Sequence, residues 1–409
     1  MTRAGRRRFN GSMAAPTGVK HPVNPEQWNW LVEQLRDWER EGLVSPDAAG
    51  AIRGRYIEGP PSRGRSAWDV LLWLGGAFVV VGLIWLVASN LDQLSPLWRF
   101  VLLAAIWVGL SVGAERLDEP FRSVGRLLAA GAFGAVIFQA AQSVQVPAYE
   151  PRLLAAWGIG AALYAYAVRS RPALIVGLGA LTAWYAWQAG ESADGVFGVV
   201  VALMIGGLVA ACAALLQPGP WASFAVVWRI VAALVSLGGI FAAALPIHDR
   251  HGTWPVIATI GAAVAVLAVV AAAVRARSRT DRIELAAAAA VALAGAGLAA
   301  WRPPVDLLLD TGNPTPAMWV RTSVSVLVFL IAAGWYAVLA QWRSSPALGA
   351  LALAALVVFT TFQSWAVFAP IISGAALFLI VGLVLLGTGY LAERARRRLR
   401  MTEPEGEPS

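Results

Sequence analysis

Polar side chains in or beside apolar segments are the residues of this chain that could do chemistry. Asn90 and Asp92 directly follow the first long apolar segment, and Gln139 and Gln142 lie in the third. The two glutamines are three residues apart, which places them on one face of a helix. Because an amide in hydrocarbon without a partner costs free energy, the glutamines must face other helices or water.

Two interpretations of these side chains are open. Asn90 and Asp92 can end a helix in an interfacial turn, and Gln139 and Gln142 can form hydrogen bonds between helices. Alternatively, the four side chains line an outward-facing polar site together with Trp157, which lies in the next apolar segment. We therefore treat all five as a candidate polar site for a small ligand.

Arg229 is the one arginine that lies well inside an apolar segment, WASFAVVWRIVAALVSLGG. A charge within the bilayer is costly and usually functional, so Arg229 is a candidate intramembrane charge. Its side chain could instead extend to the cytoplasmic headgroups, because Arg229 lies about two turns from Trp221. Glu284 begins a later apolar segment, and we expect it to pair with Arg282 or Arg279 at the interface.

No complete catalytic, nucleotide-binding or metal-binding motif is present. The sequence contains no GxxxxGKS/T, HExxH or CxxC pattern. His248, Asp249 and His251 form one close group, but zinc needs three or four ligands in a defined shell, so PIHDRHGTW is interpreted as a solvated outer loop. An enzyme would have to use isolated carboxylates such as Asp306 or Asp310. We therefore expect no cofactor and no metal.

Composition indicates that the segments around these residues cross a membrane. Hydrophobic residues make up 58% of the 409 residues, charged residues make up 14%, and the mean hydropathy is +0.64. A soluble domain carries roughly 25% charged residues. The apolar segments are often about 20 residues long, enough to cross a bilayer, and lipid requires them to be helices. The predicted fold class is therefore all-α, a polytopic helical membrane protein.

We predict about twelve membrane-spanning helices, and a count of ten or eleven is left open because two of the segments are rich in alanine. The predicted spans are 68–89, 97–114, 126–144, 152–168, 172–189, 195–216, 221–245, 254–274, 283–301, 319–341, 345–364 and 368–391.

The arginines predict the orientation of these spans. Arg116, Arg169, Arg277 and Arg343 lie in connections on one side, whereas the segments NLDQLSP and ESADG on the other side hold no basic residue. By the positive-inside rule, both termini are cytoplasmic. The single lysine, beside abundant Ala, Arg, Gly and Pro, is typical of a bacterial chain, so we expect the bacterial cytoplasmic membrane. The net charge of +8 comes from arginines at span ends, which favours the lipid bilayer as partner and argues against nucleic acid.

A small helical segment precedes the spans. Apolar residues recur at helical spacing in 25–41, and a second short stripe contains Ala48, Ile52 and Tyr56. Gly42 fits the end of the first helix, and Ser45 fits the cap of the second. We divide the chain into a disordered basic tail (1–24), a cytoplasmic αα-hairpin (25–58), a linker (59–67), the transmembrane domain (68–391) and a basic then acidic cytoplasmic tail (392–409).

Three stretches resemble a known family: LRDWEREGLVSPDAAGAIRGRY, LVASNLDQLSP and FQAAQSVQV. Over roughly residues 28–190, the chain is similar to the bacterial predicted membrane proteins catalogued as domain of unknown function 2157. Asn90, Asp92 and Gln142 match the family's pattern, whereas Leu91 stands in place of a tryptophan and Ala141 in place of a glycine. The resemblance implies a helical membrane protein and no particular activity.

Three classes of function fit these features. The first is transport or sensing of a small ligand through the candidate polar site. The second is a membrane-anchored scaffold or signalling protein whose N-terminal hairpin binds a protein partner. The third is a membrane enzyme that acts on a lipid-linked substrate, with RPPVDLLLDTGNPTPAMW as its lid. The sequence carries no indication of oligomeric state.

Overall fold

The computed structural model describes residues 21–23, 25–58 and 95–368, apart from 146, 148–149, 218, 246–253 and 302–315. Between 59 and 94 it describes only residues 71, 74–76, 78, 79 and 82. The chain divides into two compact units, Met1–Leu74 and Gly75–Ser409, and each is considered by itself.

The N-terminal unit is built on two helices, α1 (Pro25–Arg40) and α2 (Pro46–Arg53). After α1, Gly42 has a φ of 73°, a left-handed conformation that glycine adopts without strain. Ser45 starts α2 because its Oγ accepts a hydrogen bond from the Ala48 amide. Leu35 and Ala49 are the buried apolar residues between the two helices.

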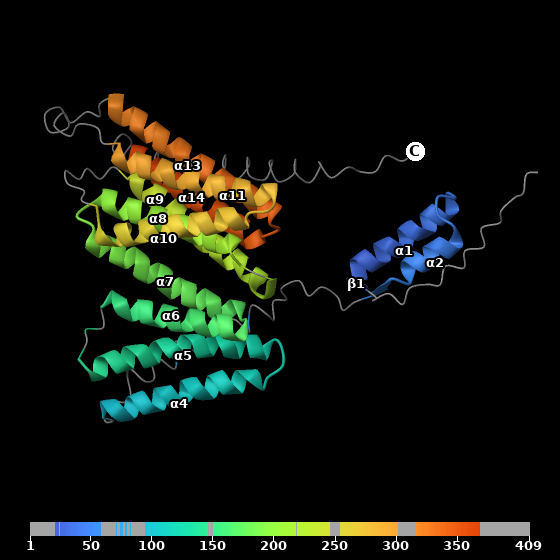
Figure 1. Ribbon diagram of the computed structural model, residues 1–409, viewed down its shortest axis with the longest axis horizontal. Coiled ribbons are helices and arrows are strands. Elements are labelled where there is room, and N and C mark those ends of the chain that lie inside the picture. The colour runs from blue at the N-terminus through green and yellow to red at the C-terminus, as the bar shows by residue number, and fades with distance from the viewer. Residues whose placement is uncertain are drawn as a thin grey trace, which may run out of the picture. The chain divides into compact units, whose positions relative to one another are not determined.

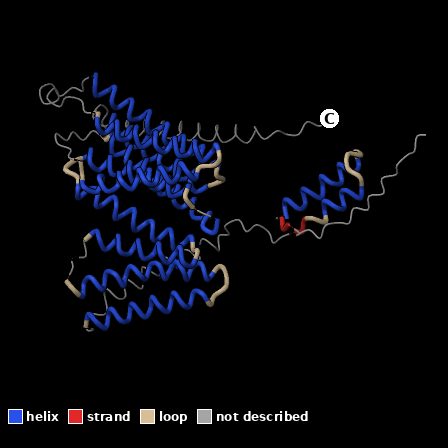
Figure 2. Tube along the Cα trace, viewed as in Figure 1, coloured by secondary structure: helices blue, strands red, loops and turns tan. Residues whose placement is uncertain are grey.

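Two short strands accompany these helices, β1 (His21–Val23) and β2 (Tyr56–Glu58). They pair in parallel with His21 opposite Tyr56, and Figure 2 shows strands only in this part of the described chain. The prediction that Tyr56 extends the second helix is wrong. The helix α2 ends at Arg53, Gly54 forms its C-cap, and Tyr56 then takes an extended conformation beside β1.

The second unit is a bundle of long helices (Figure 1). They are α4 (Pro96–Glu115), α5 (Phe121–Ser143), α6 (Pro151–Val168), α7 (Arg171–Ser192), α8 (Val196–Leu215), the 3-10 helix η1 (Gly219–Phe224), α9 (Ala225–Ala244), α10 (Val256–Arg275), α11 (Arg279–Ala300), α13 (Pro316–Trp342) and α14 (Pro346–Phe368). Prolines stand in the first turn of several of them, where the missing amide hydrogen would have no partner.

The helical membrane fold is confirmed at a coarse level. Within the described residues, 8 helices are long and apolar enough to span a membrane. Helices α6 and α7 are not among these, although they match two predicted spans and lie among the others in Figure 1. The structure describes only a few scattered residues of the predicted span 68–89 and only the first residue of the predicted span 368–391. The count of about twelve therefore stays a prediction.

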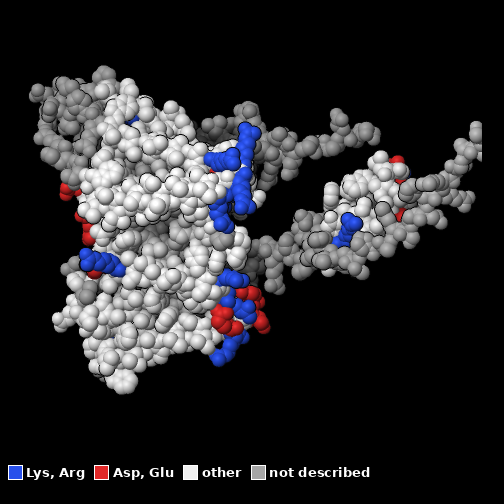
Figure 3. All heavy atoms as spheres, viewed as in Figure 1, with Lys and Arg blue, Asp and Glu red and all other residues white. Residues whose placement is uncertain are grey.

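Successive helices run in opposite directions, so alternate connections lie at the same end of the bundle. The connections α4–α5, α6–α7, α10–α11 and α13–α14 share one end in Figure 1, and basic side chains gather at that end in Figure 3. We call it the arginine-rich end. The connection α7–α8 lies at the opposite end and reads Ala-Asp-Gly.

The main core lies where α8, α9, α11, α13 and α14 meet. Met204, Ile240 and Phe329 are each about 1% exposed or less there, and the ring of Phe329 stacks on Phe359 at 3.8 Å between centroids. A second core joins α5, α6, α7 and the start of α9. The second core connects the α4–α7 row to the first, so the described helices form one packed bundle.

Glycines permit a close contact between α6 and α7. A Cβ at Gly177 would lie 2.6 Å from the backbone nitrogen of Ala162, and a Cβ at Gly158 would lie 2.6 Å from Cγ of Leu181. Small residues at such positions let membrane helices approach closely, and the resulting van der Waals packing is one of the forces that associate helices in lipid.

This contact predicts different results for two glycines on the same helix. Gly177→Ala should lower the free energy of unfolding by about 1–3 kcal/mol, because its methyl group would collide with the backbone of α6. Gly179→Ala is the control, since a Cβ there meets nothing within 4 Å. Reversible unfolding in mixed detergent micelles measures both, and equal losses would show that the close approach is wrong.

Candidate functional site

The most unusual group in the bundle is a set of four charged side chains near the arginine-rich end. Its central member is Glu284, in the second turn of α11, whose side chain is only 3% exposed. The start of α11 is held by a capping box, in which Ser278 Oγ accepts from the Asp281 amide at 3.0 Å and Asp281 accepts from the Ser278 amide. Asp281 and Glu284 are three residues apart, so both carboxylates lie on one face of the helix.

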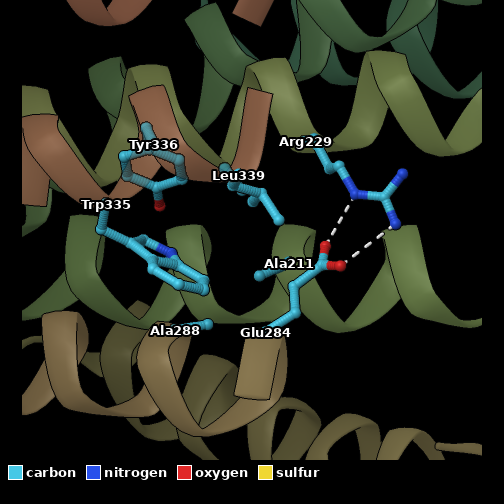
Figure 4. A pocket seen from close by; sticks show the side chains of 8 residues that line it. Ala211, Arg229, Glu284, Ala288, Trp335, Tyr336 and Leu339 are labelled. Atoms are coloured by element: carbon cyan, nitrogen blue, oxygen red, sulfur yellow. Dashed lines mark hydrogen bonds and ion pairs between the residues drawn. The ribbon is translucent and has the colours of Figure 1, made fainter. Parts of the chain in front are cut away.

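Arg229 approaches Glu284 from α9. Its Nε lies 2.7 Å from one carboxylate oxygen of Glu284 and its Nη2 lies 3.2 Å from the other (Figure 4). This two-point geometry is the strong form of an arginine–carboxylate pair. The Arg229 side chain is 11% exposed, so the contact lies inside the bundle rather than on its surface.

Arg343 approaches the same carboxylate from the end of α13. Its Nη2 donates to Glu284 Oε2 and to Asp281 Oδ1, at 2.6 Å each, and its Nε donates to Glu284 Oε2 at 2.9 Å. The chain turns directly afterwards, because Ser344 has a φ of 49° and Ser345 caps α14. We call Arg229, Asp281, Glu284 and Arg343 the charge cluster; it has two positive and two negative groups, and it joins α9, α11 and α13.

A small cavity borders the charge cluster. Arg229 and Glu284 line it together with Trp335, Tyr336 and Leu339 of α13 and alanines of α8, α9 and α11 (Figure 4). Its volume is about 10 Å³, the room that one water molecule needs. Tyr336 is 3% exposed, so an aromatic and largely apolar wall faces the charged groups.

The same three helices are joined at the opposite end by Arg321. Its Nε donates to the carbonyl of Trp301 and its Nη2 to the carbonyl of Ala243, both at 3.0 Å. These carbonyls lie at the C-terminal ends of α11 and α9, where a positive charge is favourable. Helices α9, α11 and α13 are thus held by arginines at both ends.

Among the residues that we predicted for the polar site, Gln139 is buried in α5, whereas Gln142 is exposed one turn later. Trp157 packs on Gly134 of α5, and its Nε1 donates to the Ala130 carbonyl at 2.9 Å. Asn90 and Asp92 lie outside the described residues, as do the His248 loop and the predicted lid. A site shared by these side chains therefore stays a prediction.

Arg229 was singled out from the sequence, and the structure gives it a partner within the bundle. The prediction that Glu284 pairs with Arg282 or Arg279 is wrong, because Glu284 pairs with Arg229 and Arg343. The Arg282 Nε donates instead to the Ala276 carbonyl. The sequence had marked Arg343 only as an orientation signal, because it lies in a connection between two predicted spans.

The comparisons with known proteins agree with the resemblance drawn from the sequence. The family described as Predicted membrane protein (DUF2157) matches residues 36–174. No curated protein and no solved structure matches the chain. The matched residues run from α1 into the first turn of α7, so all four members of the charge cluster lie beyond them.

The charge cluster predicts unequal losses from its two carboxylates. Glu284→Ala should lower the free energy of unfolding by about 3–5 kcal/mol, because it leaves two partly buried guanidiniums without the carboxylate that they share. Asp281→Ala, one turn earlier on the same helix, should cost about 1–2 kcal/mol, because Asp281 is more exposed and mainly caps the helix.

Unfolding of the purified variants in mixed micelles measures both values. A Glu284→Ala loss no larger than the Asp281→Ala loss would contradict the central position of Glu284.

Proposed function

We propose that this membrane protein moves a small ligand across the bilayer, and that the charge cluster closes the bundle at its cytoplasmic end. The observation that carries the proposal is the position of Glu284, a buried carboxylate held between arginines from two other helices. Ionisable groups among membrane helices usually mark a pathway or a switch, because their desolvation is costly.

A contribution to folding stability does not by itself explain why the protein contains such a cluster. A buried ion pair is often no more stabilising than well-packed apolar residues of similar volume, whereas removal of one partner is strongly destabilising. An arrangement of this kind suits helices that switch between two conformations. The charge cluster holds the helices together while all four charges are paired, and it destabilises that conformation when one charge is lost. The cluster joins the ends of three helices, so its release would free one end of the bundle.

Polar groups at the opposite end support the same proposal. Asn90, Asp92, Gln139, Gln142 and Trp157 would offer a ligand site at the outer ends of the first and third predicted spans. A ligand site that faces one side and a charge cluster that closes the other are the two parts that alternating access requires. The arginines in the connections favour the cytoplasm for the closed end.

A second candidate function rests on the N-terminal unit. Trp30 is 58% exposed on α1, and Leu43 is 69% exposed in the turn that follows. Exposed apolar side chains of this size favour a protein partner. Deletion of residues 1–60 separates the candidates, because partner binding should be lost while the conformational change described next should persist.

The transport proposal predicts reciprocal accessibility at the two ends of the bundle. Cys212, the single cysteine, is buried near the arginine-rich end of α8. Arg343→Gln should raise its labelling by a membrane-impermeant maleimide, applied from the cytoplasmic side, by about tenfold or more, because the open state becomes populated. In a Cys212→Ala background, a cysteine introduced by Gln142→Cys should become less reactive from the outer side when Arg343→Gln is added.

Arg282→Gln is the matched control, because Arg282 is a neighbouring arginine outside the charge cluster. It should leave both labelling rates unchanged. A rise at both ends in Arg343→Gln would indicate general loosening, and no change at either end would mean that the cluster closes nothing; either result contradicts the proposal.

A further inference from the structure

Two guanidiniums in this bundle share one carboxylate, and that carboxylate belongs to the protein itself. The Arg229 fork spans both oxygens of Glu284, and Arg343 holds one of them. Planar guanidinium groups are the preferred partners of carboxylates in desolvated sites. Glu284 therefore occupies the position that the carboxylate of a ligand would take between the same arginines.

We propose that Arg229 and Arg343 form a binding site for a small carboxylate ligand, which takes the place of Glu284 when Glu284 is protonated. The inference rests on the proposed transport function and names its substrate class. Binding requires no step beyond proton transfer: an acid in the solvent (hydronium ion or buffer) gives a proton to Glu284, the Glu284 side chain leaves the arginines, and the ligand carboxylate accepts the hydrogen bonds that Glu284 had accepted.

Charge balance explains why the proton and the ligand enter together. With all four groups ionised, the charge cluster is formally neutral. A carboxylate ligand alone would leave one surplus negative charge in a site of low dielectric, and a proton alone would leave one surplus positive charge. Either surplus is costly where water is excluded, whereas the pair restores neutrality.

Among the four members of the charge cluster, Glu284 is the one best placed to take up a proton and be replaced by a ligand carboxylate. They are Arg229 from α9, Arg343 and Tyr336 from α13, and Asp281 from its own helix, whereas α8 contributes Ala211 to the shared cavity. Arginine and tyrosine side chains keep their protons throughout the neutral range. Asp281 is also bound to the Ser278 amide as a helix cap, so its replacement would disturb the start of α11.

The cavity indicates the rest of the ligand. Trp335, Tyr336 and Leu339 line it beside Glu284, so the group attached to the carboxylate should be apolar or aromatic (Figure 4). The present volume is about 10 Å³, which admits a water molecule but no ligand. Displacement of the Glu284 side chain and opening at α13 must accompany binding, which agrees with a cluster that holds the closed state.

Benzoate is a suitable probe, with uncharged benzamide as its matched control. Titration calorimetry of the full-length protein in detergent micelles, at about pH 5.5 and about pH 7.5, should show benzoate affinity rising by up to about tenfold per unit fall in pH. Benzamide should bind weakly and without dependence on pH. Arg282→Gln should behave like the unmodified protein, and Arg229→Gln should lose benzoate binding.

Glu284→Gln mimics the protonated side chain and should bind benzoate at about pH 7.5 at least as tightly as the unmodified protein does at about pH 5.5, with no dependence on pH. The pH comparison on the unmodified protein needs no variant, so it decides the question even if Glu284→Gln does not fold. Absence of benzoate binding, benzoate affinity independent of pH, or benzamide binding of equal strength each overturns the inference. Binding without reciprocal labelling at Cys212 and Gln142→Cys would overturn transport alone.

Discussion

The requirement that a carboxylate buried among membrane helices must be fully paired governs how α9, α11 and α13 meet. Glu284 is 2% exposed, and its desolvation is offset only because two arginines reach it. Arg229 must therefore lie at the depth of the second turn of α11, and α13 must end where Arg343 can turn inward. The sharp turn at Ser344 and the cap at Ser345 follow from the same need, since α14 begins directly behind the cluster.

Close packing by small residues makes that pairing possible. A Cβ at Gly295 on α11 would lie 2.2 Å from Sδ of Met204, and one at Gly239 on α9 would lie 2.3 Å from its Cε. Met204 of α8 therefore fills the space between the two helices that carry Glu284 and Arg229. Arg321 ties the far ends of α9, α11 and α13 through backbone carbonyls, so the trio is restrained at both ends and packed in the middle.

The sequence allowed the helical membrane class and most described helices to be predicted, because apolar length in lipid admits few alternatives. It also singled out Arg229, since an arginine within an apolar segment stands out against its neighbours. The partners of Glu284 were missed because they lie 55 and 59 residues away along the chain, and no local spacing encodes such contacts. Tyr56 was misplaced for a similar reason, since its strand forms only by pairing with residues 21–23. Asn90 and Asp92 remain predictions.

The central claim is that Arg229 and Glu284 stabilise the bundle as a pair and not as two separate side chains. A double-mutant cycle with Arg229→Gln and Glu284→Gln, measured by reversible unfolding in mixed micelles, tests this most directly. We predict a coupling free energy of about 2 kcal/mol or more, because each single substitution leaves a buried charge with an incomplete set of partners. Losses that add to within about 0.5 kcal/mol would contradict the account, since independent sites give that result.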